Sequence, residues 1–226
     1  MLYRVLTLAM NTYREAVRAR ILHGLLGLAV GTCGYALVVG AYSLGNQARV
    51  VADLGSASIS LYSIVVAIVL GATSLYRELE LKTIFPILAR PLRRGEYLLG
   101  KFVGTVLTLA VFVALNSGLL LFALAALGRG ALLVSIAWPL GLLAVAGLVA
   151  WRVPMSRSWL PLPLAVLALL LGAWCARDAV TESRVILGQA LLSTLEVCII
   201  AALTLLFAAF SSPFLTAIFS LSVFVV

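Results

Sequence analysis

Residues 77–101 read RELELKTIFPILARPLRRGEYLLGK, the densest charged segment of a chain that is 64% hydrophobic. Long apolar runs precede and follow this segment. It holds six of the sixteen basic residues and three of the eight acidic ones: Arg77, Lys82, Arg90, Arg93, Arg94, Lys101, Glu78, Glu80 and Glu96. We therefore expect a short excursion out of a membrane between two spanning helices.

Composition sets the class of the whole chain. Only 11% of the residues are charged and the mean hydropathy is +1.18, whereas a soluble globular domain carries roughly 25% charged residues. Runs of about 20 apolar residues can satisfy their backbone groups in lipid only as helices. The sequence predicts an all-α fold, a polytopic transmembrane helical bundle that forms a single membrane domain over residues 1–226.

Composition also argues against several functions. The net charge of +8 arises from basic residues scattered in membrane-flanking loops, so no nucleic acid partner is expected. Cys33, Cys175 and Cys198 lie inside apolar runs without metal-ligand spacing, and we expect them to be buried hydrophobic residues. With one histidine and no carboxylate–histidine constellation, we expect no catalytic residue, metal or cofactor on this chain.

Seven apolar stretches predict membrane spans. Polar loops are expected between them, at 45–55, 77–101, 152–157 and 177–184. The spans are expected at 21–44, 56–76, 102–127, 131–151, 158–176, 185–210 and, incompletely, 214–226. The last stretch is too short to cross about 30 Å of hydrocarbon, so we infer that the chain is truncated at its carboxyl end.

Residues 1–20 predict an amphipathic helix that lies on the membrane surface, with lipid as its partner. One face is apolar, with Tyr3, Leu6, Met10, Tyr13 and Val17 at helical spacing. The opposite face carries Arg4, Asn11, Glu15 and Arg18. The alternative is that these residues are the start of the first span.

The first span carries a stripe of small residues, Gly24, Gly27, Gly31 and Gly34, along one helix face. Such a face lets another helix backbone approach closely. The stripe could pack within the protomer or form the seam of a dimer.

The distribution of basic residues predicts the orientation. With six complete spans, the amino terminus, residues 77–101 and residues 152–157 lie on one side. That side carries twelve of the sixteen basic residues. We therefore expect the amino terminus and residues 77–101 to be cytoplasmic.

Residues 84–89 predict a short amphipathic helix inside the cytoplasmic loop. Thr83 can cap it, Pro86 falls in the first turn, where a missing N–H costs nothing, and Pro91 ends it after Arg90. Ile84, Phe85 and Leu88 share one face. A helix this short is not stable alone, so it either docks into a groove of another protein or merely covers the loop.

Three stretches resemble one protein family. Residues 78–104, ELELKTIFPILARPLRRGEYLLGKFVG, resemble the coupling region of type-two ABC transporter permeases, with its Ala-Arg-Pro and Tyr-Leu-Leu-Gly-Lys signatures. Residues 11–30, NTYREAVRARILHGLLGLAV, resemble the start of that family. Residues 205–225, LLFAAFSSPFLTAIFSLSVFV, carry a Ser-Ser-Pro break that is familiar there. The three stretches occur in the expected order.

The resemblance implies the membrane-spanning permease subunit of an exporter in the inner (cytoplasmic) membrane, working as a dimer with a second copy or a paralogue. Each half would dock on a separate ABC ATPase subunit that binds ATP and Mg²⁺, since this chain has no Walker motif. Thr83, Ile84, Phe85, Leu88 and Arg90 would form the coupling helix. Glu78, Glu80, Arg93 and Arg94 would frame the contact. The chain departs from the family at 131–176, an apolar pair beyond the usual six spans.

Two polar residues are candidates for a transport path. Glu196 is the ionisable residue deep in a predicted span, and such a carboxylate is a functional candidate by default. It could instead hold helices together through Gln189, Ser193 or a neighbouring helix. Asn116 is the second candidate.

Other functions stay open at this stage. The chain could be an ATPase-linked membrane protein that transmits force or regulates a partner without moving solute. It could also be a secondary transporter or channel, although such proteins usually place several polar groups at the midplane.

Overall fold

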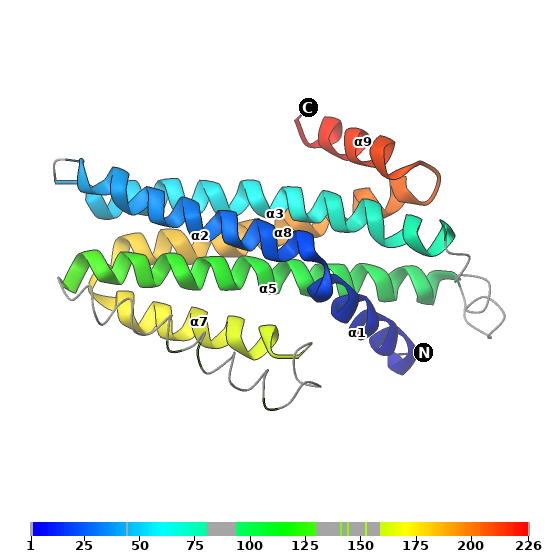
Figure 1. The fold of residues 1–226 in the computed structure, drawn as a ribbon, viewed down its shortest axis with the longest axis horizontal. Coiled ribbons are helices and arrows are strands. Elements are labelled where there is room, and N and C mark those ends of the chain that lie inside the picture. Colours follow the sequence, from blue (N-terminus) through cyan, green and yellow to red (C-terminus); the bar gives the residue numbers. More distant parts are fainter. Residues whose placement is uncertain are drawn as a thin grey trace. The chain divides into compact units, whose positions relative to one another are not determined.

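The computed structural model describes residues 2–43, 45–80, 94–129 and 159–225, with the single positions 141, 144 and 152. This part of the chain is helical and contains no strand, which confirms the all-α class (Figure 1). In chain order its helices are α1 (Leu2–Arg18), α2 (Arg20–Ala41), α3 (Gln47–Glu80), α5 (Arg94–Arg129), α7 (Pro161–Cys175), the 3₁₀ helix η2 (Ala176–Asp178), α8 (Val180–Ala208) and α9 (Pro213–Val225).

Five of these helices are long and apolar enough to cross a membrane. They include Leu22–Ala41, Gln47–Thr73, Gly95–Leu127, Pro161–Asp178 and Val180–Ala208. The chain is therefore a multi-pass membrane protein by the length and composition of its helices. The predicted fourth span, 131–151, and the loop at 152–157 lie outside the described ranges, apart from the isolated positions.

The predicted polar loop at 45–55 is wrong for most of its length, because α3 already begins at Gln47. Arg49 and Asp53 face each other one turn apart, with 3.8 Å between Nε and Oδ2. Val51 and Ala52 are buried beside them. Charged residues of opposite sign at this spacing stabilise a helix, so polar sequence alone did not indicate a loop.

The described residues divide into two compact units. Unit 1 comprises Met1–Ala19, Ser63–Leu109 and Leu195–Val226, and unit 2 comprises Arg20–Tyr62 and Ala110–Thr194. Helices α3, α5 and α8 therefore each contribute residues to both units.

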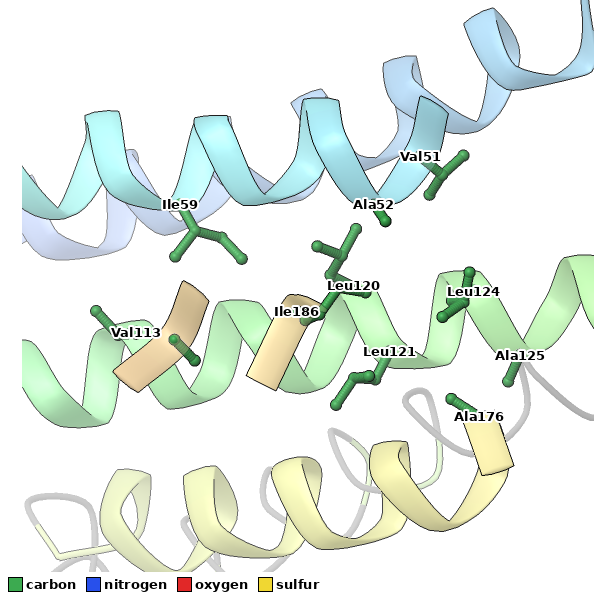
Figure 2. Packing of buried hydrophobic residues seen from close by; sticks show 11 residues of the cluster. Val51, Ala52, Ile59, Val113, Leu120, Leu121, Leu124, Ala125, Ala176 and Ile186 are labelled. Carbon is green, nitrogen blue, oxygen red and sulfur yellow. The ribbon is translucent and has the colours of Figure 1, made fainter. Parts of the chain in front are cut away.

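Unit 2 has a continuous hydrophobic core between α3, α5, η2 and α8. Figure 2 shows Ala52 and Ile59 of α3 pointing toward α5, from which Leu120 points back. Leu121, on the other side of α5, points toward α7. The core also contains Val51, Val113, Leu124, Ala125, Ala176, Ile186 and Ala190.

Helices α5 and α7 of unit 2 approach each other at the level of their backbones. A Cβ at Gly118 would lie 2.7 Å from the carbonyl carbon of Ala168, and one at Gly172 would lie 2.8 Å from the Gly118 carbonyl oxygen. The contacts advance in the same direction along both helices, so α5 and α7 run parallel, as Figure 1 shows.

Unit 1 contains a second close approach and a helical hairpin. Gly71 of α3 lies directly against the Thr204 side chain of α8, so a Cβ at Gly71 would collide with it. The chain then breaks at the predicted Ser-Ser-Pro, where the Ser211 and Thr216 hydroxyls are 2.7 Å apart. The Phe207 and Phe219 rings, with centroids 5.7 Å apart, hold α9 against α8.

The three cysteines are free and half-buried. The sequence predicts that they are buried, and the difference has a physical cause. In a membrane protein the outward face of a helix is covered by lipid, so an apolar run does not indicate which residues face the protein interior.

The α5–α7 contact can be tested at Gly118. Gly118→Val places methyl groups where the Ala168 backbone lies, and overpacking of this kind costs about 1–3 kcal/mol. We expect a lower thermal unfolding temperature for the purified protein. Gly188→Val is the matched control in the same unit, because a Cβ at Gly188 meets no atom within 4 Å. Equal stability of the two variants would contradict the contact.

Candidate functional site

The predicted docking residues for an ATPase subunit lie around residues 81–93, between the end of α3 and the start of α5. Helix α3 ends at Glu80 and α5 begins at Arg94, so Glu78, Glu80 and Arg94 belong to helix backbone. Thr83, Ile84, Phe85, Leu88, Arg90 and Arg93 lie outside the described residues. The coupling helix therefore stays a prediction.

Helix α1 packs in parallel on the first turns of α5, immediately after that gap. A Cβ at Gly100 would lie 2.6 Å from the Leu8 Cβ, and a Cβ at Gly104 would lie 2.5 Å from the Ala9 carbonyl oxygen. We call this contact the α1–α5 junction. Gly100 and Gly104 have the Gly-x-x-x-Gly spacing that permits backbone contact between helices.

The structure refines the predicted faces of α1. Its charged face is exposed as expected, with Arg4, Asn11, Glu15 and Arg18 all outward. The predicted apolar face divides into two parts. Tyr13 and Val17 are buried, whereas Tyr3 and Leu6 are 82% and 62% exposed. An exposed apolar stripe beside a basic face is the surface that an interfacial helix presents to a bilayer.

Charged and phenolic groups are buried around the junction. Lys101 is only 2% exposed, and its Nζ lies 5.8 Å from the centre of the Tyr97 ring, within range of a cation–π interaction. Glu96 is buried in the same turns of α5. Tyr97 packs against Leu8 of α1 and Ala208 of α8, so three helices meet around its ring.

The Tyr13 phenol is fully buried in unit 1, and its hydroxyl has no hydrogen-bond partner among the described residues. Burial raises the pKa of Tyr13 to about 12, because the phenolate would lose its hydration. The phenol therefore stays protonated through the physiological pH range and acts as a packing group.

The two candidates for a transport path lie in different units. Glu196 is half-buried on α8 in unit 1. Asn116 is buried on α5 in unit 2, and its Nδ2 donates to the Phe112 carbonyl 2.8 Å away. Gln189, considered as a partner of Glu196, donates from Nε2 to the Ser193 hydroxyl at 3.4 Å.

The glycine stripe of α2 is open. A Cβ at Gly24, Gly27, Gly31 or Gly34 would meet no atom within 4 Å. Among the described residues, packing within the protomer therefore does not explain the stripe.

Sequence reasoning missed the α1–α5 junction, although the signal was present. Residues 100–104 read GKFVG, the same small-residue spacing that drew attention to α2. The described residues contain no group of three or more His, Cys, Asp or Glu side chains that could hold a metal ion.

Comparison of the chain with known protein families, with curated proteins and with solved structures finds no match.

The α1–α5 junction can be tested at Gly104. Gly104→Val puts methyl groups against the Ala9 carbonyl and the Thr12 side chain, so we expect α1 to detach. Amide hydrogen exchange in residues 5–17 should then be several-fold faster by mass spectrometry. Gly95→Val on the same helix is the control, because a Cβ there meets no atom within 4 Å. Unchanged exchange in Gly104→Val would show that the junction does not hold α1.

The Tyr13 environment predicts a dependence of stability on pH. The unfolded chain releases this proton near the ordinary pKa of about 10, whereas the folded chain retains it until about 12. The folded state is therefore destabilised as the pH rises above about 10. Between about pH 9 and about pH 11, Tyr13→Phe should lose less thermal stability than the parent protein. Tyr3→Phe, at an exposed position, should behave like the parent; equal losses in all three would contradict this burial.

Proposed function

We propose that this chain is the membrane-spanning permease subunit of an ATP-binding cassette exporter, with ATP hydrolysed on a separate subunit. The proposal rests on one observation: the sequence of residues 77–101 resembles a coupling region. In the structure, α3 and α5 lead into and out of this segment. Both helices are long and apolar enough to cross a membrane.

The continuity of these two helices supports a mechanical role. Helix α5 runs unbroken from Arg94 to Arg129, so its polar first turns and its apolar body form one rod. Helix α3 likewise continues through its last charged turn to Glu80. The eight residues from 94 to 101, which precede the predicted span 102–127, amount to about 12 Å of helix. A force applied to the intervening segment would pass directly into two spans.

The α1–α5 junction supports a second part of the proposal. Because α1 packs on the polar first turns of α5, movement of α5 would carry the amphipathic helix with it. The charged face of α1 and its exposed Tyr3 and Leu6 fit the cytoplasmic membrane surface. In the inner membrane, with the amino terminus cytoplasmic, α1 would brace the coupling segment against the bilayer.

The remaining partner is a second copy of this chain or a paralogue. Two permease halves would enclose the transport path, and the open stripe at Gly24, Gly27, Gly31 and Gly34 offers one surface for their contact. Glu196 would serve either this path or the packing of the spans. Its half-buried position in α8 is compatible with both roles.

The docking role of residues 83–90 can be tested with Phe85→Asp. A carboxylate would replace the apolar anchor of the predicted coupling helix, and burying an unpaired charge in a groove is costly. We expect the ATPase subunit to be lost when the full-length protein is purified from its native membrane, with insertion of the permease unchanged.

Tyr42→Asp is the matched control, since Tyr42 is an 85% exposed aromatic residue in the turn after α2. This variant should retain the ATPase. Retained binding in Phe85→Asp would mean that the segment does not dock a partner. If the parent protein purifies without an ATPase, the proposed function fails. Nucleotide-dependent uptake into inverted vesicles separates transport from force transmission without solute movement.

A further inference from the structure

A small, partly open cavity lies in unit 2, where α2, α3 and α5 meet. Its volume is about 10 Å³, close to the space that a single water molecule requires. It is lined by Ala29, Thr32, Cys33, Gly55, Ser58, Ile59, Asn116, Leu119 and Leu120. Three of these residues carry side-chain oxygen, and each comes from a different helix.

The two hydroxyl groups offer the cavity acceptors. Thr32 Oγ1 donates to the Ala29 carbonyl of its own helix at 2.9 Å. Ser58 Oγ donates to the Leu54 carbonyl at 2.7 Å. A hydroxyl has one proton and two lone pairs. Each group has therefore used its only proton within its own helix and retains accepting capacity.

Asn116 supplies the remaining donor. It is 5% exposed, and its Nδ2 donates one hydrogen to the Phe112 carbonyl at 2.8 Å. A carboxamide has two N–H donors and a carbonyl acceptor. One N–H and the accepting capacity of Oδ1 are thus left for other groups.

The cavity lies between helices that can span a membrane, so its polar groups depend on whatever occupies it for further hydrogen bonds. Thr32 lies near the middle of α2, and all three polar residues fall within helices that can span a membrane. The hydrocarbon region offers no solvent to buried polar groups. A guest that uses these groups would donate to two of the three oxygens, accept from Asn116 and be no larger than one small molecule. Water has two donors and two acceptors and meets these requirements.

We propose that one water molecule binds in this cavity and bridges Thr32, Ser58 and Asn116, linking three spans by hydrogen bonds. A buried water commonly makes about three hydrogen bonds, which is the number of polar residues here. The bridge matters most for α2, since only 17% of its apolar window is buried, the smallest share among the five candidate spans. This inference does not depend on the proposed transport function.

Water-edited solid-state NMR of the full chain in lipid bilayers tests the site directly. Magnetisation is transferred from water protons to labelled threonine, serine and asparagine carbons. We expect several-fold faster build-up at Thr32, Ser58 and Asn116 than at Thr194. Thr194 is the internal control, since it lies in the same unit, donates to its own helix at the Ala190 carbonyl and does not line the cavity.

Two variants sharpen the result. Ala29→Val adds two methyl groups to the cavity wall, so build-up at Thr32 and Ser58 should fall to the level of Thr194. Ser58→Ala removes one acceptor but leaves room for the water, and fast transfer to Thr32 and Asn116 should persist. If build-up in the parent protein equals that at Thr194, or if transfer comes from lipid acyl protons instead, no water occupies the cavity and the proposal is overturned.

Discussion

Close contact between helix backbones is the constraint on which both units of this protein depend. Lipid is as apolar as leucine, so helices in a membrane gain little from hiding apolar side chains from one another. What holds them is van der Waals contact, which small residues allow at short range. At Gly104 the absence of a side chain lets α1 approach α5, and at Gly71 it makes room for the Thr204 side chain. Gly118 and Gly172 let α5 and α7 approach each other closely. Each of these three helix pairs has at least one such glycine, and a larger side chain there would push the two helices apart.

Three buried threonines satisfy their hydroxyl groups within their own helices. The Thr105, Thr108 and Thr204 hydroxyls donate to carbonyls one turn back in their own helices, at 2.9 Å in each case. A buried polar group without a partner would be costly in lipid. Pairing within the helix removes this cost and keeps the side chain compact, so threonine serves at a tight interface much as alanine does.

The sequence predicted the all-α class and helices long and apolar enough to cross a membrane, because apolar length is a local property. It failed where a polar segment is helical, as at Arg49 and Asp53, since composition cannot distinguish an exposed helix from a loop. It also failed to predict how helices pair. Tyr13 and Tyr3 look equivalent in a 3.6-residue pattern, yet one is fully buried and the other 82% exposed. A periodic pattern within one helix does not show which of its residues pack against segments far along the chain.

At the candidate site, too, the local sequence indicates one part of the structure and the packing of distant segments determines another. Residues 77–101 stood out through charge alone, and the structure adds that uninterrupted helices lead into and out of the gap. A flexible joint at either end would absorb any force within the loop. A helix resists bending, so displacement at Arg94 must appear along the rest of α5 and at the helix packed on Gly100 and Gly104. Transmission of a displacement along α5 requires a stiff helix more than it requires particular side chains. The glycines that bind α1 to α5 are therefore as much a part of the proposed coupling as the charged residues that first drew attention to the segment.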